Sequence, residues 1–341
     1  MATAQTYPRL GVVIVSYNST DRTLEAVRSV LHSDYAGETR VVVVEIADID
    51  QKSSLSHKTR GSIPSETAHS ETRSRSELST KLLELKHSNK FSITHIERDN
   101  RGFSASNNEG IKSLQEFDPA FYLLMNNDAS IAPSTLTSIM KEVQSLPTSS
   151  VPRIYGPKIW FTAGMEYYRD EYAQQERGSV IWYAGGVFDS KNLLSWHRGV
   201  DEVDLGQFDR TEQTDFVTGC FLLIPSETWR KVGELEERYF MYLEDLDYSF
   251  RVKKAGGEVW YLGVGGVWHD NAGSSGGAGS RFHRYYQTRN RIAFALQHLG
   301  IRQKLAAIRL ALRLCLKGSR IERKAASHAL LSNFPRKRIE V

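Results

Sequence analysis

The stretch LGVVIVSYNSTDRTLEAVRSVLHSDYAGETRVVVVEIA, residues 10–47, decides the fold. Leu10–Ser16 is a mostly apolar run that ends in a polar turn, Thr20–Ser33 carries apolar side chains at helical spacing, and Arg40–Ile46 is a second apolar run. Strand, helix and strand in this order predict a parallel sheet with crossover helices, whose ligand crevice lies beyond the carboxyl ends of the strands. We therefore expect functional residues directly after each apolar run.

The remainder of the chain extends this α/β pattern and then departs from it. Between residues 49 and 90 the sequence is rich in Ser, Thr, Lys, Arg and Glu, which predicts an inserted, mobile polar loop. Further strands and helices are expected over Ser92–Ile96, Ser104–Leu114, Phe121–Met125 and Pro133–Leu146. After residue 155 glycines and aromatic residues dominate. Short strands are expected there around Trp160, Val180–Tyr183 and Phe216–Ile224.

The composition is that of a folded protein. The chain has 341 residues, of which 40% are hydrophobic and 25% charged, enough to bury a full core. The two cysteines, Cys220 and Cys315, fit neither a disulfide framework nor a metal-ligand pattern, so we expect reduced thiols. The sequence shows no signal-peptide pattern and no apolar run near the ~20 residues that span a bilayer, which predicts a cytoplasmic protein.

Positive charge is concentrated between Arg302 and Arg338, although the formal net charge is only +4. The apolar residues that recur at helical spacing beside these basic ones are Leu305, Ile308, Leu312 and Leu316. Two interpretations are open: an amphipathic helix on the anionic inner face of the cytoplasmic membrane, or a helix packed on the main domain. No RNA- or DNA-recognition motif accompanies the basic residues, so no nucleic-acid partner is expected.

Asn126, Asn127 and Asp128 directly follow the apolar run Tyr122–Met125. A carboxylate at the end of a parallel strand is well placed to bind a hard divalent cation, because such ions often take one or two protein carboxylates plus substrate phosphate oxygens. Asp128 is the candidate ligand. The alternative is an Asx turn that only ends the strand.

Three carboxylates, Glu244, Asp245 and Asp247, lie beside aromatic residues at the start of a helical pattern. Partial burial of such groups raises a carboxyl pKa and prepares a general base. The alternative is an ordinary helix start, since the helix dipole favours acids in the first turn.

A third group of candidates runs from Trp268 to Asn290. His269 can complete a metal site, the glycine-rich stretch Gly273–Gly279 can wrap a diphosphate, and Tyr285 and Arg289 can bind diphosphate oxygens. Each has a structural alternative, a packed histidine or a flexible linker. The glycine stretch lacks the Lys and the spacing of a Walker loop, which argues against an ATP site.

A set of motifs extends in order over residues 10 to about 295. The motifs are VVIVSYN at Val12–Asn18, NRGFSASNNEGI at Asn100–Ile111, LLMNNDASI at Leu123–Ile131, YAGGVFD at Tyr183–Asp189, TGCFLLIPSETWRKVG at Thr218–Gly233, FMYLEDLDYSFRVKKAG at Phe240–Gly256, and VWHDNAGSSGG with YYQTRN. The set resembles glycosyltransferase family 2, and within it the rhamnosyltransferase-like bacterial members.

The resemblance implies one α/β domain of the A-type glycosyltransferase fold over residues 8–295, with a Rossmann-like, mostly parallel central sheet. Residues 8–150 would bind the nucleotide and 151–295 the acceptor, followed by a basic helical extension over 296–341. The implied activity is inverting transfer from a nucleotide-sugar donor to a saccharide or lipid-linked saccharide in bacterial surface polysaccharide synthesis. dTDP-rhamnose is the first expected donor, with a UDP-hexose or UDP-galactofuranose as alternatives. The surplus of helix in the extension is compatible with a homodimer.

The resemblance also implies roles for individual residues. Asp245 would be the general base, with Glu244 and Asp247 orienting acceptor hydroxyls or shifting its pKa. Asp128 and His269 would hold a divalent cation, Mn²⁺ or Mg²⁺. The residues implied for the donor nucleotide are Ser16, Tyr17, Asn18, Glu45, Asp48, Arg101, Asn107, Asn127 and Asp128. Those implied for the diphosphate are His269, Ser274, Ser275, Tyr285 and Arg289, and those for the sugar and acceptor are Trp182, Gly185, Gly186, Gly219 and Cys220.

The chain departs from the family pattern at two positions. Asn126 stands first in the Asp-any-Asp motif, and Glu45 stands where the second strand usually has an Asp for the pyrimidine, with Asp48 three residues later. These departures leave open another class, a catalytically silent partner subunit that binds sugar nucleotides or glycans. A sugar nucleotidyltransferase is disfavoured, because Ser16–Asn18 stands where its glycine-rich loop would follow the first strand.

Overall fold

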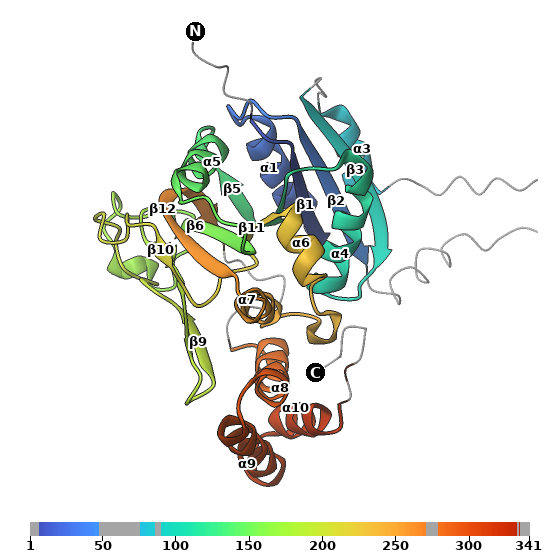
Figure 1. Cartoon of the computed structure of the whole chain (residues 1–341), viewed down its shortest axis with the longest axis vertical. Coiled ribbons are helices and arrows are strands. Elements are labelled where there is room, and N and C mark those ends of the chain that lie inside the picture. The colour runs from blue at the N-terminus through green and yellow to red at the C-terminus, as the bar shows by residue number, and fades with distance from the viewer. Residues whose placement is uncertain (1–6, 48–75, 86–89, 271–278, 333, 335–341) are drawn as a thin grey trace, which may run out of the picture.

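The computed structural model describes residues 7–47, 76–85, 90–270, 279–332 and 334. These residues form a mixed central sheet with helices on both faces and a group of helices at one end of the molecule (Figure 1). The strand order is β10-β12-β6-β11-β4-β1-β2-β3, with β5 paired to β12 and β7 paired to β6. The expected α/β class with C-terminal helices is confirmed.

The first part of the chain supplies the parallel half of the sheet. Its strands are β1 (Leu10–Tyr17), β2 (Thr39–Ala47), β3 (Phe91–Asp99) and β4 (Phe121–Asn126), and its helices are α1 (Thr20–Leu31), α3 (Glu77–Glu84), α4 (Phe103–Ser113) and α5 (Thr135–Ser145). β1 pairs in parallel with both β2 and β4, and β2 pairs in parallel with β3. The crossover pattern expected from residues 10–47 is therefore confirmed.

β1 reads as a nearly continuous apolar run because both of its faces are buried. Val12 packs in one core with Leu24 of α1, and Val13 packs in the other core with Ile111 of α4. Gly110 allows α4 to approach the sheet closely, since a Cβ at this position would lie 2.3 Å from Val13 Cγ1. The helices on both faces thus fix β1 at the centre of the fold.

Part of the polar segment 49–90 is a helix, which corrects the expectation of a loop throughout. α3 begins at Ser76, whose hydroxyl accepts a hydrogen bond from Ser79 N, and it packs on α1. Its apolar anchors, Leu78 and Leu82, lie one turn apart and are buried. Two leucines in a polar stretch are too weak a periodic signal to predict a helix. Residues 48–75 and 86–89 lie outside the described residues.

The second part of the chain widens the sheet beyond β4. Its strands are β5 (Ala129–Ile131), β6 (Arg153–Phe161), β7 (Ile181–Tyr183), β8 (Gly186–Asp189), β9 (Leu194–His197), β10 (Glu212–Gln213), β11 (Phe221–Pro225) and β12 (Glu258–His269), and its helices are α6 (Ser226–Val232) and α7 (Glu244–Lys254). β11 runs antiparallel between β4 and β6, and β12 runs parallel to β6. The ends of β4 and β12 and the beginning of β11 therefore meet at one edge of the sheet.

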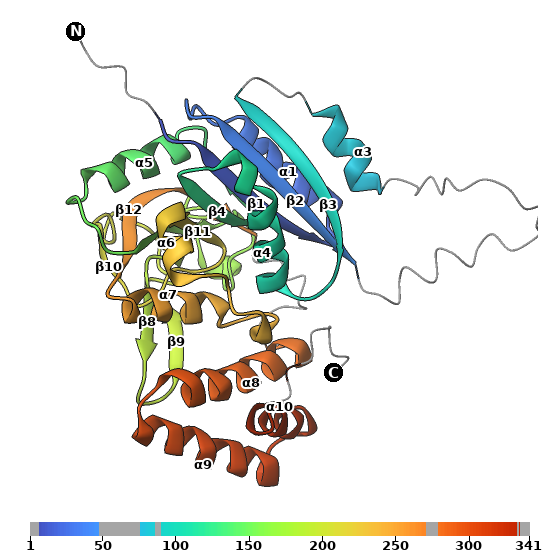
Figure 2. The same cartoon turned by 45° about the vertical axis from the view of Figure 1, so that its right-hand side comes forward.

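Three helices, α8 (Arg281–His298), α9 (Ile301–Lys317) and α10 (Arg320–Leu330), pack together at one end of the molecule. The hairpin of β8 and β9 extends toward the same end (Figure 2). The domain boundary expected at residue 295 falls inside α8. Among the helices the structure describes, none combines the length and the apolar character needed to cross a membrane.

Candidate active site

A cavity of about 530 Å³ opens at the edge where β4 and β12 end and β11 begins. This edge lies at the carboxyl ends of the parallel strands, where the crevice was expected. The predicted site residues that line the cavity are Tyr17, Asn127, Asp128, Trp182, Gly219, Cys220, Glu244, Asp245 and His269. The fold thus brings together residues from distant parts of the chain, including an aspartate–histidine pair and two further carboxyl groups.

Asp128 and His269 form a buried pair in this cavity. His269 Nε2 lies 3.1 Å from Asp128 Oδ1, and the two side chains are 7% and 11% exposed. His269 is the last residue of β12 and pairs with Ala129 of β5, directly after Asp128. The register of β5 on β12 therefore holds the two side chains together. The other ring nitrogen of His269, Nδ1, is buried and has no hydrogen-bond partner among the described residues.

Burial and charge act in opposite directions on this pair. Burial raises the pKa of the Asp128 carboxyl, but His269 and Arg22 outweigh it and hold that pKa below its usual value. Burial disfavours the charged form of His269, but Cys220 and Asp128 favour it, and the pKa of His269 is raised well above its usual value. Trp182 packs on the imidazole, with ring centroids 4.3 Å apart. The charged forms of the two side chains therefore stabilise each other, and an aromatic ring covers the pair.

Glu244 and Asp245 reach the cavity from the first turn of α7. Asp245 accepts hydrogen bonds from Gly219 N at 3.0 Å and from Leu246 N at 2.8 Å. Burial raises the pKa of Asp245 although these two bonds lower it. Burial and the neighbouring Asp245 raise the pKa of Glu244 well above its usual value, and Glu244 Oε2 has no hydrogen-bond partner among the described residues. Of the two carboxyl groups, Asp245 is therefore the one whose charged form the surrounding backbone N–H groups stabilise.

Asp247 lies away from the cavity lining, which differs from the acceptor role implied for it. It is fully buried and accepts hydrogen bonds from the Tyr239 hydroxyl at 3.1 Å and from Arg251 Nε at 2.7 Å. Its Oδ1 also lies 2.5 Å from His298 Nε2. Asp247 thus links α7 to the end of α8.

Two predicted nucleotide residues at the end of β1 do not line the cavity. Ser16 is buried and shares a hydrogen bond of 2.7 Å with the Thr23 hydroxyl of α1. Asn18 is exposed in the turn after β1, at φ 48°. Tyr17, between them, does line the cavity. The predicted residues that lie outside the described residues are Asp48, Ser274 and Ser275.

The predicted residues around α4 make contacts within the protein rather than lining the cavity. Arg101 forms an ion pair of 2.8 Å with Glu237, and Asn107 donates to the Phe103 carbonyl within α4. Gly102 has φ 95°, and a Cβ there would lie 2.3 Å from the Phe240 carbonyl oxygen. The close contact between α4 and this loop explains the glycine in the NRGFS motif.

Gly185 and Gly186 do not line the cavity but lie next to a residue that does. Gly185 has φ 107°, a conformation that favours glycine, and a Cβ on Gly186 would lie 2.4 Å from the ring of Phe216. Phe216 itself lines the cavity. The two glycines therefore let the chain between β7 and β8 pack against a wall residue.

Tyr285 and Arg289, expected to bind diphosphate, are buried in α8 and do not line the cavity. The Tyr285 hydroxyl lies 2.6 Å from His328 Nδ1 of α10. Arg289 donates hydrogen bonds to the carbonyls of Arg238 and Tyr239. Both side chains are therefore occupied by contacts inside the protein.

Asn290, next to Arg289, stabilises the loop that leads into α7. Its Nδ2 donates to the carbonyls of Tyr239, Met241 and Tyr242 at 3.0, 2.8 and 2.8 Å. Phe240, Tyr242 and Leu243 all have positive φ in this loop, between 63° and 71°. α8 thus holds an unfavourable backbone conformation directly before Glu244 and Asp245.

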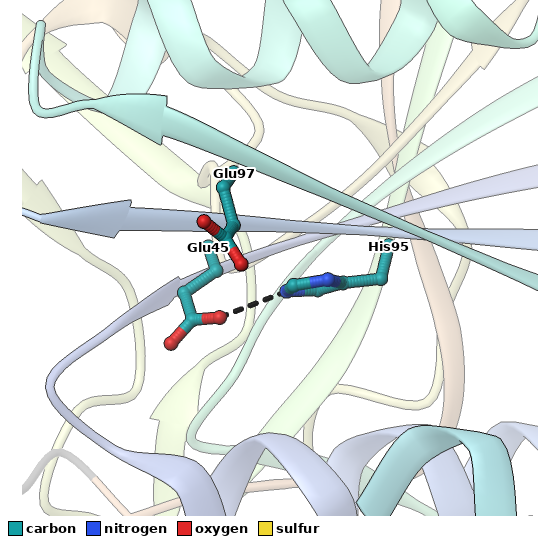
Figure 3. Close-up of side chains that lie close together, drawn as sticks. All are labelled: Glu45, His95 and Glu97. Atoms are coloured by element: carbon teal, nitrogen blue, oxygen red, sulfur yellow. Dashed lines mark hydrogen bonds and ion pairs between the residues drawn. The ribbon is translucent and has the colours of Figure 1, made fainter. Parts of the chain in front are cut away.

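Glu45 lies on β2, where it contacts β3 rather than the cavity (Figure 3). Its Oε2 accepts a hydrogen bond from Ser76 Oγ at 2.6 Å and lies 2.8 Å from His95 Nε2. The hydrogen bond with His95 lowers the pKa of Glu45, although burial opposes it. Glu97 pairs with Glu45 across the strands, and ligand-type atoms of Glu45, His95 and Glu97 lie within 4.8 Å of one another. Glu45, which was expected to contact the nucleotide base, is thus one member of a carboxylate–imidazole cluster.

Sequence reasoning missed several cavity residues. Trp196 and His197 of β9 line the cavity without any local motif that marks them, and Tyr242 lines it from within the motif Phe240–Gly256, where no role was expected for it. Burial lowers the pKa of His197 to about 4, so its imidazole is neutral and packs on Trp182. These residues reach the cavity through the β8–β9 hairpin and the loop before α7, whose positions depend on tertiary packing.

Known proteins similar in sequence include two sugar transferases. No protein-family model matches the chain. It is 24% identical over 193 residues to the low-salt glycan biosynthesis hexosyltransferase Agl10 of Haloferax volcanii, which covers 56% of this chain and 56% of the relative. It is 39% identical over 61 residues to the N-acetylglucosaminyl-diphospho-decaprenol L-rhamnosyltransferase of Mycobacterium tuberculosis, which covers 18% of this chain and 20% of the relative. The aligned region thus spans about half the length of the first relative and a fifth of the second.

Similar solved structures include the mannosyltransferase PcManGT from Pyrobaculum calidifontis in complex with GDP-Man and Mn²⁺. That match has a TM-score of 0.44 and 14% identity and covers 96% of this chain and 75% of the other. A second is S. aureus TarS 1–349 in complex with UDP-GlcNAc, with a TM-score of 0.48, 15% identity and coverage of 96% and 82%.

Proposed function

We propose that this protein is an inverting glycosyltransferase that uses a nucleotide-sugar donor, a divalent cation and Asp245 as general base. The observation that carries the proposal is that the Asp128–His269 pair and Asp245 line the same cavity. In an inverting transfer the acceptor oxygen attacks the anomeric carbon from the face opposite the departing nucleotide diphosphate. A diphosphate site and a base must therefore face one sugar, and groups that line a single cavity can meet this requirement.

Asp245 is suited to take the proton of the acceptor hydroxyl. As the acceptor oxygen bonds to the anomeric carbon, the bond from that carbon to the nucleotide diphosphate breaks and the hydroxyl proton passes to the carboxylate. The hydrogen bonds from Gly219 N and Leu246 N fix the carboxylate, and burial raises its pKa toward a useful range for a base. Burial raises the pKa of Glu244 beside it well above the usual value, and the protonated form of this carboxyl group can donate a hydrogen bond to an acceptor hydroxyl.

Asp128 and His269 fit a divalent cation, which would take the place of the proton on His269 Nε2. Two ligand atoms bound to one ion at about 2.1 Å and at right angles lie about 3.0 Å apart, and the Oδ1–Nε2 separation is 3.1 Å. Among the described residues, the pair is not part of a larger His, Cys or acidic cluster, which leaves coordination positions for substrate oxygens. Such an ion, when bound, neutralises charge on the leaving diphosphate. Asn127, beside Asp128, also lines the cavity.

dTDP-rhamnose is the first donor to test, with a UDP-hexose or UDP-galactofuranose as alternatives. The name of the mycobacterial relative includes both rhamnosyl transfer and a diphospho-decaprenol-linked acceptor, whereas the Haloferax relative is named only a hexosyltransferase. Tyr17 lines the cavity at the end of β1, where it can stack on the base of either nucleotide. A lipid-linked saccharide of bacterial surface polysaccharide synthesis is the proposed acceptor.

α9 supports contact with an anionic membrane surface on the cytoplasmic side. Its buried residues, Ala307 and Ala311, pack on the neighbouring helices. Its exposed apolar residues lie on a different face and are Ile301, Leu305, Leu312 and Leu316. The basic residues Arg302, Arg309 and Arg313 flank this exposed stripe at helical spacing. Of the two open interpretations of these leucines, lipid contact is therefore favoured over core packing.

The test combines donor binding with transfer. Calorimetric titration with dTDP, UDP, dTDP-rhamnose and UDP-hexoses, each with and without Mn²⁺, should identify one nucleotide whose binding needs the cation. Asp128→Ala should weaken that binding about 10- to 100-fold. Asp245→Asn should bind the donor as the wild type does but lose about 10²- to 10⁴-fold in kcat for transfer, because it lacks the base.

Asp170→Asn is the matched control, because this carboxylate is 88% exposed on the surface. It should leave both binding and transfer unchanged. If the wild type binds no nucleotide with or without the cation, the enzyme proposal fails and a catalytically silent glycan-binding subunit replaces it. Full transfer by Asp245→Asn would instead remove only the assignment of the base.

A further inference from the structure

A second cavity of about 170 Å³ adjoins the first, between the β8–β9 hairpin and α8. Ser195, Leu243, His283 and Gln287 line both cavities. Leu243 directly precedes Glu244 and Asp245, so the shared wall lies next to the proposed base. A molecule whose hydroxyl reaches Asp245 could therefore extend into the second cavity.

Two arginines on one face of α8, Arg284 and Arg291, line this cavity. Arg284, Gln287, Thr288 and Arg291 lie at the spacing of successive helical turns and all line it, while no Asp or Glu does. Arg291 Nε is buried and has no hydrogen-bond partner among the described residues. Burial lowers the pKa of Arg291, as expected for a charge removed from water without compensation. Arg291 as a whole is partly buried, but a buried Nε–H group without a partner is costly, and a bound anion would relieve that cost.

The remaining walls of the cavity are apolar. They are formed by Phe188, Leu193, Leu194, Leu246 and Phe294. Leu194 is 47% exposed, so an apolar surface continues from the cavity to the outside of the hairpin. Two guanidinium groups together with apolar walls suit a phosphate attached to a hydrocarbon chain better than a free sugar or a nucleotide base.

We propose that the second cavity binds the phosphate of a lipid-linked acceptor, through Arg284 and Arg291, while the attached saccharide lies at Asp245. This inference rests on the proposed glycosyltransferase function and adds the site that would select an acceptor by its phosphate. The donor's diphosphate is assigned elsewhere, to Asp128 and His269. Two separate phosphate sites would let donor and acceptor occupy the protein together.

The test measures binding of farnesyl diphosphate to the full chain by calorimetry, with EDTA present to exclude cation-dependent binding at the donor site. Arg291→Met should weaken binding about 10- to 100-fold, because a charged hydrogen bond to phosphate is lost. Arg284→Gln, at an exposed position, should weaken it about 3- to 10-fold. Arg291→Lys keeps the charge but not the fork, and should fall between wild type and Arg291→Met.

Two control variants distinguish the second cavity from the donor site and from a general effect of surface charge. Arg28→Met removes one charge from an exposed position on α1 and should leave binding unchanged. Asp128→Ala should lose cation-dependent nucleotide binding but keep farnesyl diphosphate binding. Inorganic diphosphate, which lacks the hydrocarbon chain, and farnesol, which lacks the charge, should both bind more weakly than farnesyl diphosphate.

Wild-type affinity in both arginine variants would overturn the inference. An equal loss of farnesyl diphosphate binding in Asp128→Ala would also overturn it, because the probe would then bind at the donor site. Equal affinity for inorganic diphosphate would overturn it as well, because the hydrocarbon chain would then contribute nothing to binding. If nucleotide binding fails while farnesyl diphosphate binding still depends on Arg291, the lipid-phosphate site stands and the glycosyltransferase proposal fails.

Discussion

Asp245 and Asp247 are two residues apart on α7, and helical geometry gives them different roles. Residues at i and i+2 are about 200° apart around a helix, so one faces the cavity when the other faces the core. Asp245 is fixed by Gly219 N beside the cavity, whereas Asp247 is fully buried between Tyr239, Arg251 and His298. The first position is therefore open to chemistry and the second stabilises the fold that presents it.

Asp247→Asn should destabilise the protein by roughly 3 kcal/mol at pH 7, because it removes the charge of a buried, paired carboxylate. Burial raises the pKa of Asp247, but His298 and Arg251 lower it further, so the folded-state value lies below the unfolded value of about 3.9. The stabilisation is therefore present above that pH and is lost as the pH falls through the folded-state value. Urea unfolding from pH 7 to pH 3 should show the difference between wild type and variant shrinking below about pH 4.

Asp21→Asn is the matched control for this measurement. Asp21 pairs with Lys81 on the surface and is 94% exposed, so its loss should leave the free energy of unfolding nearly unchanged. A pH-independent difference between Asp247→Asn and wild type would show that the charge of Asp247 is not what stabilises the fold.

At the scale of elements, α8 holds the loop that presents the carboxylates. The loop between Tyr239 and Glu244 contains three non-glycine residues at positive φ, each of which costs about 1–3 kcal/mol unless its surroundings enforce it. Asn290 holds the loop in this conformation through three hydrogen bonds to its carbonyls. Phe103 N donates a fourth hydrogen bond, to the Phe240 carbonyl at 2.6 Å. The helix is thus a positioning element for residues some fifty positions earlier in the chain.

Asn290→Ala should lower kcat about 10-fold or more while leaving the affinity for the donor nucleotide near the wild-type value. The loop can relax once its carbonyls lose their donors, which displaces Asp245 but not Asp128 or His269. Steady-state kinetics and calorimetry on the same preparation separate the two effects. Gln297→Ala, an exposed position on the same helix, should change neither. Equal loss of binding and kcat in Asn290→Ala would indicate general unfolding rather than positioning.

Apolar runs made most of the elements predictable, because β1, β2 and β4 are buried on both faces and leave an unbroken pattern. α3 escaped prediction because only Leu78 and Leu82 anchor it. Tyr285 and Arg289 were assigned to a diphosphate because their side chains donate equally well to phosphate and to backbone carbonyls. Only tertiary packing distinguishes these uses: Arg289 donates to carbonyls of the loop before α7, and the Tyr285 hydroxyl contacts His328 of α10. Neither contact has a local signature in the sequence.

At the scale of the whole molecule, the proposed acceptor site and the exposed apolar surface lie at the same end. The β8–β9 hairpin, which carries the exposed Leu194 and Trp196, extends toward the helices α8 and α9 in both views (Figures 1 and 2). The second cavity lies between this hairpin and α8. A membrane contacted through α9 would therefore lie on the side from which a lipid-linked acceptor would enter.

This arrangement predicts that the stripe on α9 controls membrane binding. Leu312 and Leu316 are 52% and 79% exposed, and burying a leucine in lipid contributes about 1.5–3 kcal/mol. Leu312→Gln with Leu316→Gln should therefore lower affinity for phosphatidylglycerol-containing vesicles about 10-fold or more in a sedimentation assay. Wild-type binding should also weaken on neutral vesicles, since each basic residue near an anionic surface contributes about 1 kcal/mol.

The matched control exchanges two exposed leucines outside the stripe, Leu83→Gln with Leu205→Gln, and should bind as the wild type does. If the stripe variant also binds as the wild type does, α9 is not the contact and the acceptor must reach the second cavity without a membrane-bound enzyme. If the stripe variant loses vesicle binding but keeps full activity on a water-soluble acceptor, α9 serves only to bring the cavity to the membrane surface. The catalytic cavity and the membrane contact would then be separable parts of one chain.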